Sequence, residues 1–239
     1  MFCFVEWQMS RKDLYEVLFS MGKKQKEKPW GKAMSIIDIR AKIPNDIFTA
    51  LELNMLLEGY SNKAQRISLM LKKGEIIQIR RGLYAFAEAL RKGLIVEGVL
   101  ANMIYGPSYV SEEFALSYYG LIPEAVYAVT SVCIGRSRSF DTPFGRYAYR
   151  YSRSKAYSIG IDRIGDQGRS FLMASPEKAL FDKAFFDKRF NGDAPEDYLL
   201  EDLRVDLDML AAQKFRYLDE LKPFFCGRLR KLGNYLEGL

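Results

Sequence analysis

The residues with the most recognisable chemistry lie between positions 61 and 86, in the stretch SNKAQRISLMLKKGEIIQIRRGLYAF. If the first half of this stretch is helical, one face of the helix carries five residues, namely Asn62, Gln65, Arg66, Leu69 and Lys73. Four of the five can hydrogen-bond to base edges or phosphates of DNA. Leu69 is the exception, and it can either touch a thymine methyl group or pack on another part of the protein. Lys63 and Lys72 add charge to the same helix.

The helix that positions these residues is predicted over 61–73. Ser61 or Asn62 can cap its start, because a short side-chain oxygen there accepts from a free backbone N–H group. Gly74 ends it, since glycine adopts the left-handed conformation without steric cost. A helical period predicts a buried stripe on the face opposite the polar one, formed by Ala64, Ile67 and Leu71 with Met70 at its flank.

A hairpin with a basic tip is predicted directly after this helix. Ile77 and Ile79 alternate with Gln78, which indicates a half-buried strand, and residues 83–86 return as its partner. Arg80 and Arg81 fall at the bend. Two shorter helices are expected before, over 34–43 and 50–58. Together these elements predict a winged helix, whose helix enters the major groove while the hairpin tip contacts the flanking backbone or the minor groove. The alternative is an ordinary helix and hairpin with a polar outer surface.

The composition limits the class of protein. The chain has 239 residues, a net charge of +6 and a pI near 9.1, which favour anionic partners such as nucleic acid. Basic residues outnumber acidic ones seven to two between positions 61 and 91. The absence of histidine excludes a histidine general base or ligand. Three widely spaced cysteines predict no disulfide framework, and we expect a cytoplasmic protein without a signal peptide or membrane span.

The predicted fold is α+β, with a winged helix-turn-helix followed by a mixed α+β domain. We expect an N-terminal extension and linker at 1–30, a winged-helix DNA-binding domain at 31–90 and a C-terminal domain at 91–239. In the last of these, helices are predicted over 93–104, over 111–120 with Ser111 as the cap, and over 175–186. Three or four more are predicted over 195–236. Strands are predicted over 126–134, 145–152, 157–164 and 170–173, and a turn over 140–144.

Three motifs have the spacing of catalytic groups but are better explained by structure. Ser175 and Lys178 match the Ser-x-x-Lys of acylating enzymes, yet Ser175-Pro176 is also a good helix start. Tyr151 and Lys155 have the Tyr-x-x-x-Lys spacing of some dehydrogenases, without the glycine-rich loop those need. Asp206 and Asp208 could hold Mg²⁺, but they occur in a polar helical stretch. We therefore predict no catalytic residue, no metal site, no cofactor and no enzymatic activity.

A second basic group is interleaved with aromatic residues in the C-terminal domain. Its arginines are Arg136, Arg138, Arg146, Arg150 and Arg153. Arginines and aromatic rings on a strand can bind single-stranded nucleic acid by charge and stacking. A sheet whose tyrosines face the core and whose arginines face water explains the same pattern. Both interpretations stay open, with RNA or a protein toxin as the possible partner.

Four segments, taken in order, resemble one known family. They are RRGLY at 80–84, GPSYVSEEFALSYYGLIPE at 106–124, TPFGRYAYR at 142–150 and ASPEKALFD at 174–182. In this order the chain is similar, over roughly 34–190, to the AbiEi-type antitoxins of type IV toxin–antitoxin systems, bacterial transcriptional regulators linked to abortive infection by phage. The resemblance implies a winged helix that represses its own operon at inverted repeats in the promoter. It also implies a C-terminal domain that counters a nucleotidyltransferase toxin.

The hypothesis is therefore a DNA-binding repressor and antitoxin. Its expected DNA-binding residues are Asn62, Lys63, Gln65, Arg66, Lys72, Lys73, Arg80 and Arg81. Inverted repeats need two copies, which can be a stable dimer or two monomers that meet on DNA. The alternative is a protein- or RNA-binding neutraliser that does not recognise a DNA sequence.

Overall fold

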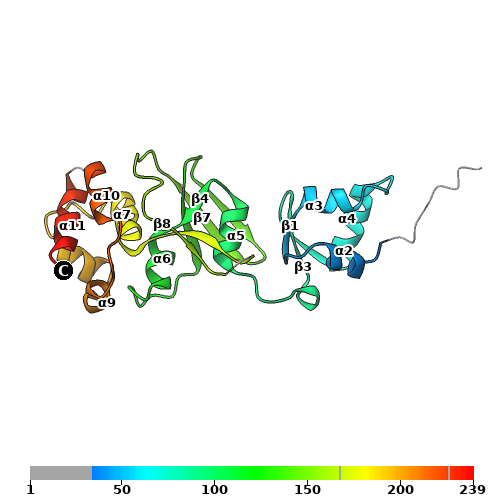
Figure 1. Cartoon of the computed structure of the whole chain (residues 1–239), viewed down its shortest axis with the longest axis horizontal. Coiled ribbons are helices and arrows are strands. Elements are labelled where there is room, and N and C mark those ends of the chain that lie inside the picture. Colours follow the sequence, from blue (N-terminus) through cyan, green and yellow to red (C-terminus); the bar gives the residue numbers. More distant parts are fainter. Residues whose placement is uncertain (1–33, 167, 226) are drawn as a thin grey trace, which may run out of the picture.

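The computed structural model describes residues 34–166, 168–225 and 227–239. The predicted extension and linker at 1–30 lie outside the described residues. Helices and strands alternate in a mixed α+β architecture, as predicted. Figure 1 shows two lobes arranged end to end, which we call the N-terminal lobe (34–90) and the C-terminal lobe (91–239).

The N-terminal lobe contains three helices and a three-stranded sheet. In chain order its elements are α2 (Ile36–Lys42), β1 (Ile47–Thr49), α3 (Ala50–Leu56), α4 (Lys63–Lys72), β2 (Ile76–Arg80) and β3 (Leu83–Phe86). The sheet is antiparallel with the order β1-β3-β2. Ile39, Leu53 and Met70 come from the three helices and pack on Phe48 and Phe86 of the sheet. The helices thus cover one face of the sheet.

Local signals define where these helices begin and end. The hydroxyl of Thr49 accepts from the N–H of Glu52, and the Glu52 carboxylate accepts from the N–H of Thr49, which forms a capping box for α3. The side chain of Asn62 accepts from the N–H of Gln65, so Asn62 rather than Ser61 caps α4. Gly74 has a φ of +65° and ends the helix as predicted.

Two details of this lobe differ from the prediction. Ala64 is exposed, while Met70, expected only at the flank of the buried stripe, is fully buried. The strand after the helix was expected to alternate regularly, with Ile77 and Ile79 on one face. Its register shifts between Gln78 and Arg80, and the buried residues are Ile76 and Ile79. Such a bulge inserts one residue and reverses the faces that follow it.

The C-terminal lobe is built on a six-stranded mixed sheet. Its strands are β4 (Ser108–Val110), β5 (Ala128–Cys133), β6 (Arg138–Thr142), β7 (Gly145–Tyr151), β8 (Ile161–Ile164) and β9 (Phe171–Ala174). Their order in the sheet is β6-β7-β5-β4-β9-β8. The pairs β5–β7 and β4–β9 are parallel and the others are antiparallel. The strands β6 and β8 therefore form the two edges.

Helices complete the C-terminal lobe. They are α5 (Glu97–Ile104), α6 (Glu112–Tyr118), α7 (Pro176–Phe186), α8 (Pro195–Asp197), η2 (Tyr198–Asp202), α9 (Leu207–Ala211), α10 (Leu218–Leu221), η3 (Lys222–Phe224) and α11 (Arg228–Glu237), while the short η1 (Glu88–Leu90) ends the N-terminal lobe. The Tyr149 hydroxyl of β7 donates to the Ala101 carbonyl of α5. The last helices gather at the end of the molecule opposite the N-terminal lobe (Figure 1).

Several boundaries in this lobe correct the sequence-based prediction. The expected turn at 140–144 belongs to a hairpin, because β6 pairs with β7 through Thr142 and Gly145. The strand β4 follows Pro107 where only a break was expected. The helix expected from residue 93 begins at Glu97, and the strand expected from residue 157 begins at Ile161. The strand β4 depends on pairing with β5, which follows α6 in the sequence, and local sequence does not reveal this pairing.

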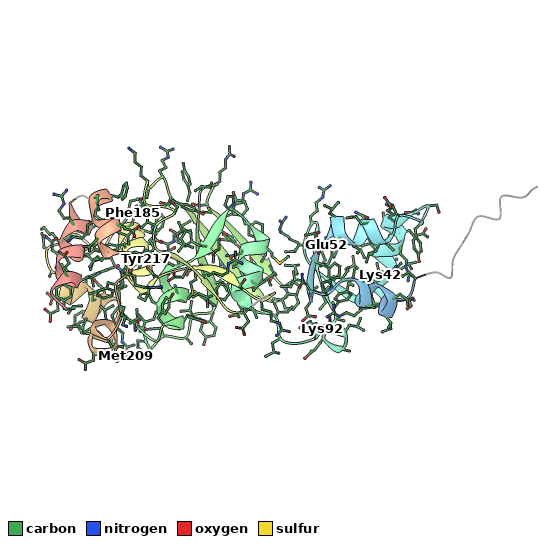
Figure 2. All side chains as sticks on the ribbon, viewed as in Figure 1. Lys42, Glu52, Lys92, Phe185, Met209 and Tyr217 are labelled. Carbon is green, nitrogen blue, oxygen red and sulfur yellow. The ribbon has the colours of Figure 1, made fainter. Side chains whose placement is uncertain are left out.

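The sheet of the N-terminal lobe is buried on both faces. Tyr84 and Phe86 belong to the core of the N-terminal lobe, whereas Leu83 and Ala85 pack into the core of the C-terminal lobe. Ile79 joins the second group. Figure 2 shows side chains of both lobes meeting at the narrow waist between them. The β2–β3 hairpin thus packs against a hydrophobic core on each of its two faces.

No helix in the described part of the chain is long and apolar enough to cross a membrane.

Substitution of Gly98 by alanine is expected to destabilise the C-terminal lobe. A Cβ atom at Gly98 would lie 2.3 Å from ring carbons of Phe171, which is itself buried. We expect a loss of roughly 1–3 kcal/mol in the free energy of unfolding, as for other overpacked cores. This loss outweighs the gain of about 1 kcal/mol that alanine brings to a helix. Urea unfolding monitored by circular dichroism measures it.

The control for this substitution is Gly59→Ala. A Cβ atom at Gly59 meets nothing within 4 Å. Its stability should therefore stay near that of the wild type, and an equal loss in both variants would contradict the packing argument.

Candidate nucleic-acid interface

The solvent face of α4 is polar and largely free of internal bonds. Gln65, Ser68, Leu69 and Lys72 are all exposed, and the Leu69 side chain is 42% accessible. The side chains of Gln65 and Lys72 have no hydrogen bond or ion pair within the described part of the chain. They therefore remain available to an external ligand. Ser68 was missed by the prediction, although its spacing of three from Gln65 and four from Lys72 indicates the same face.

Two predicted DNA-binding residues of α4 are instead directed toward the protein. The ammonium group of Lys63 donates to the Asn54 carbonyl at 3.1 Å, which links the start of α4 to α3. The Arg66 guanidinium donates to the Met34 carbonyl at 2.8 Å and is only half-exposed. Long basic side chains can bury their stems in this way while the charged head reaches a carbonyl. Both residues thus contribute to holding the helices together.

The remaining predicted residues lie at the surface. Asn62 is exposed although its oxygen caps α4, and Lys73 is exposed with only a distant acidic neighbour, Glu75, at 4.0 Å. Arg80 and Arg81 are exposed at the hairpin tip. The tip has a fixed position, because the N–H of Ala50 at the start of α3 donates to the Gly82 carbonyl.

The five arginines of the C-terminal lobe do not form one surface. In the register of the sheet, Arg138 of β6 lies opposite Tyr149 of β7 and shares its face, whereas Arg150 points to the other face. Tyr147 and Tyr149 are buried, as the aromatic face of β7 predicted. The group therefore divides into two parts.

One part is a corner at the ends of β5 and β7, which we call the arginine corner (Arg136, Arg138 and Arg153). All three side chains are exposed. The guanidinium of Arg138 lies over the Tyr105 ring and that of Arg153 over the Tyr151 ring, each with 5.6 Å between the guanidinium carbon and the ring centroid. This arrangement offers charge next to aromatic rings.

The other part, Arg146 and Arg150, lies on the opposite face of the sheet. Arg146 is exposed and has only a loose contact with Asp141, at 3.8 Å. Arg150 pairs with the buried Glu112 at 3.3 Å and lies over the Phe186 ring. It therefore contributes to the packing of α6 and α7 against the sheet.

A buried polar network, which the sequence analysis missed, connects α7 to the segment around β4. The Asp182 carboxylate accepts from the hydroxyls of Tyr109 at 2.9 Å and Ser111 at 2.8 Å, and its other oxygen pairs with Lys178 at 3.0 Å. Burial and the neighbouring Asp182 raise the pKa of Tyr109 far above its usual range. The four side chains are almost completely buried. Each charge in the network is thus compensated within the core.

This network also corrects the role predicted for Ser111. The residue occupies the position before α6, but its side chain makes no capping hydrogen bond, because the hydroxyl donates to Asp182. The following residue, Glu112, has a φ of +55° and a side chain with no exposed surface. Ser111 thus links the start of α6 to α7 by a hydrogen bond and does not cap its own helix.

Glu112 is an unusual carboxylate. Neither of its oxygens has a hydrogen bond, and Arg150 is its nearest cation. Burial, only partly offset by Arg150, raises its pKa to about 8. Glu112 is therefore mainly protonated at neutral pH.

Two of the three motifs with catalytic spacing contain residues with structural roles. Ser175 caps α7 by accepting from the N–H of Lys178, which confirms the interpretation as a helix start. Lys178 pairs with Asp182. Asp206 caps α9 by accepting from the N–H of Met209. Among the described residues, no group of three or more acidic or cysteine side chains is placed to hold a metal ion.

Comparisons with known proteins assign no family to this chain. No protein-family model matches it, and no curated protein matches it significantly.

Replacement of Glu112 by glutamine is expected to change how stability depends on pH. Between about pH 4.5 and pH 8 the carboxyl is ionised in the unfolded chain but protonated in the folded one. The wild type should therefore lose stability as the pH rises through this range, by no more than about 1.4 kcal/mol per pH unit from this group. Glu112→Gln should lack this loss and be the more stable protein at pH 8. Urea unfolding at pH 5, 6, 7 and 8 measures the difference.

The exposed Glu201 provides the matched control. Glu201→Gln should keep the pH dependence of the wild type. A Glu112→Gln variant with that same dependence would show that Glu112 titrates normally in the folded protein.

Proposed function

We propose that the protein is a DNA-binding transcriptional regulator whose N-terminal lobe is a winged helix. The observation that carries the proposal is the solvent face of α4, where Gln65 and Lys72 have no internal partner among the described residues. The element order α2-β1-α3-α4-β2-β3 supports it, since a helix-turn-helix followed by a hairpin is the plan of a winged helix. The exposed arginines at the hairpin tip provide a second contact.

In this proposal α4 enters the major groove. Gln65 can form two hydrogen bonds with an adenine edge, and the Ser68 hydroxyl can bond to a neighbouring base. Lys72 and Lys73 neutralise phosphates near the end of the helix. Arg81 reaches the adjacent backbone or minor groove from the hairpin tip. Since the outer face of the hairpin sheet is covered by the C-terminal lobe, the tip is the part of the hairpin that DNA can reach.

The biological role is proposed from the family resemblance. The motifs at 106–124, 142–150 and 174–182 support repression of the protein's own operon at inverted repeats and an antitoxin role against a nucleotidyltransferase toxin. Two copies must then bind side by side, as a dimer or as two monomers. The residues of these motifs include Ser111, Glu112 and Asp182. Their burial supports a structural role in the lobe that would counter the toxin.

Removal of the basic residues should weaken DNA binding and reduce its salt dependence. We expect Lys72→Ala/Lys73→Ala and Arg80→Ala/Arg81→Ala each to bind the native upstream duplex more weakly. The slope of log affinity against log salt should fall by about 0.9 for each phosphate that the variant no longer neutralises. Gln65→Ala should instead lose about 1–3 kcal/mol of discrimination between the native and a shuffled duplex. Fluorescence anisotropy across a salt series measures all three.

Lys188→Ala is the control for charge. Lys188 is exposed near the end of α7, in the C-terminal lobe, and its loss lowers the net charge without touching the proposed interface. Its affinity and salt slope should match the wild type. Equal, weak binding of the wild type to both duplexes would reject the proposed function.

The arginine corner favours a second candidate function, the binding of single-stranded RNA by the C-terminal lobe. The guanidinium groups of Arg138 and Arg153 lie over tyrosine rings, and Tyr151 is exposed beside them. A base that stacks on such a ring gains about 1–3 kcal/mol. This lobe would then neutralise a toxin through RNA and without DNA.

Fluorescence anisotropy with a labelled single-stranded RNA tests this second function. Arg136→Ala/Arg138→Ala should weaken RNA binding at least tenfold, because it removes two charges from the corner. Arg146→Ala/Lys188→Ala removes the same charge from other surfaces and should leave binding unchanged. Equal weakening by both double variants would indicate general attraction of charge rather than a site.

A further inference from the structure

A pocket of about 240 Å³ opens at the junction of the two lobes. The N-terminal lobe contributes Asp46 and Ile47 to its wall. The C-terminal lobe contributes Val99 and Met103 of α5, and Arg169 from the loop between β8 and β9. A molecule in this pocket would therefore touch both lobes at once. Binding sites for small molecules often occur at such domain interfaces.

The pocket is lined by both apolar and polar side chains, and α5 contributes much of its apolar part. Ile47 is buried, while Val99 and Met103 are half-buried and pack against the core of the C-terminal lobe. Leu94 also lines the pocket, and 84% of its surface is accessible. A bound apolar group would cover these side chains and remove them from water.

Two cationic side chains at the pocket are incompletely compensated. The Arg169 side chain is 51% accessible, and its guanidinium makes no hydrogen bond to another described residue. Its acidic neighbour is Asp46, whose Oδ2 lies 3.7 Å away. The other oxygen of Asp46 already accepts from the Arg40 guanidinium and the Lys92 N–H. The ammonium group of Lys92 has no ion pair within the described part of the chain.

The Arg169 guanidinium lies close to the segment that joins the two lobes. A Cβ atom at Gly93 would be 2.4 Å from one of its nitrogens. Figure 2 labels Lys92 in the segment that joins the two lobes, next to this glycine. The pocket thus combines apolar side chains, a guanidinium and a neighbouring ammonium group.

We propose that this pocket binds a small organic anion, a carboxylate or a phosphate ester, with an apolar ring. The anionic group would pair with Arg169 and Lys92, and the ring would lie between Ile47, Val99 and Met103. The volume is below the range of roughly 300–1,000 Å³ that is usual for drug-sized ligands, so the ring system is small. The second part of the proposal rests on the proposed DNA-binding function. The bound anion changes the affinity for DNA by favouring one arrangement of the two lobes.

Isothermal titration calorimetry of the full chain, without DNA, tests the binding site. The probes are naphthalene-2-carboxylate, its phosphate counterpart 2-naphthyl phosphate and the neutral naphthalene-2-carboxamide. At least one of the two anions should bind one to one and at least tenfold more tightly than the carboxamide, and their comparison identifies the preferred anionic group. Arg169→Gln should abolish this preference, because it removes the charge and keeps the polar side chain. Equal binding of all three probes, or an unchanged preference in Arg169→Gln, would overturn the proposal.

Two further variants exclude indirect effects. Arg163→Gln removes an exposed arginine from the neighbouring strand β8 and should bind the anions as the wild type does. Val99→Phe places a ring in the pocket and should weaken all three probes at least tenfold, with a melting curve to verify that it is folded. Full binding by a folded Val99→Phe variant would place the site elsewhere and reject the pocket.

Anisotropy with the upstream duplex tests the regulatory part. A saturating concentration of the tighter anion should shift DNA affinity at least threefold in the wild type and not in Arg169→Gln. DNA binding that is equal with and without the anion would reject the regulatory part. A protein that binds no DNA under either condition would refute the proposed function, while the calorimetric result would still decide the pocket.

Discussion

The arrangement of the whole molecule depends on one sheet with two apolar faces. All four residues of β3 are buried, because Tyr84 and Phe86 face the helices of the N-terminal lobe while Leu83 and Ala85 face the C-terminal lobe. A strand alternates its side chains between faces, so a buried hairpin must be covered twice. This constraint sets the position of the hairpin tip, holds the lobes together at a narrow waist and creates the pocket beside it. The outer surface of α4 is left to solvent.

Local chemistry made much of the fold predictable. Two helices begin at residues whose side chains accept a hydrogen bond from a free backbone N–H group, Thr49 and Ser175. Another ends at Gly74, which adopts a positive φ. None of these local signals depends on distant residues. The short strands β4 and β6 were missed because three to five residues with mixed polarity carry little periodic signal. The strand β4 forms by pairing with β5 beyond α6, and β6 forms by closing a hairpin with β7. The bulge after Gln78 likewise arises from pairing.

The candidate site was predictable to a similar degree. Helical periodicity placed Gln65, Leu69 and Lys73 on the exposed side of α4, but it could not distinguish Arg66 from them. Arg66 turns inward because its partner is the Met34 carbonyl, 32 positions away in the sequence. The polarity of Ser111 indicated a helix cap, whereas its partner is Asp182, 71 positions away. Long-range partners of this kind decide which polar residues of a pattern stay free for function.

The network around Asp182 has a consequence for how the sequence can vary over evolution. Loss of Lys178 alone would leave a buried carboxylate without its counterion. Loss of Asp182 alone would leave the buried ammonium group and two hydroxyls without their partner. Either change is strongly unfavourable, whereas replacement of the whole set by apolar residues of similar size can be neutral. These positions are therefore expected to covary among homologues, retained as a set in one lineage and exchanged as a set in another.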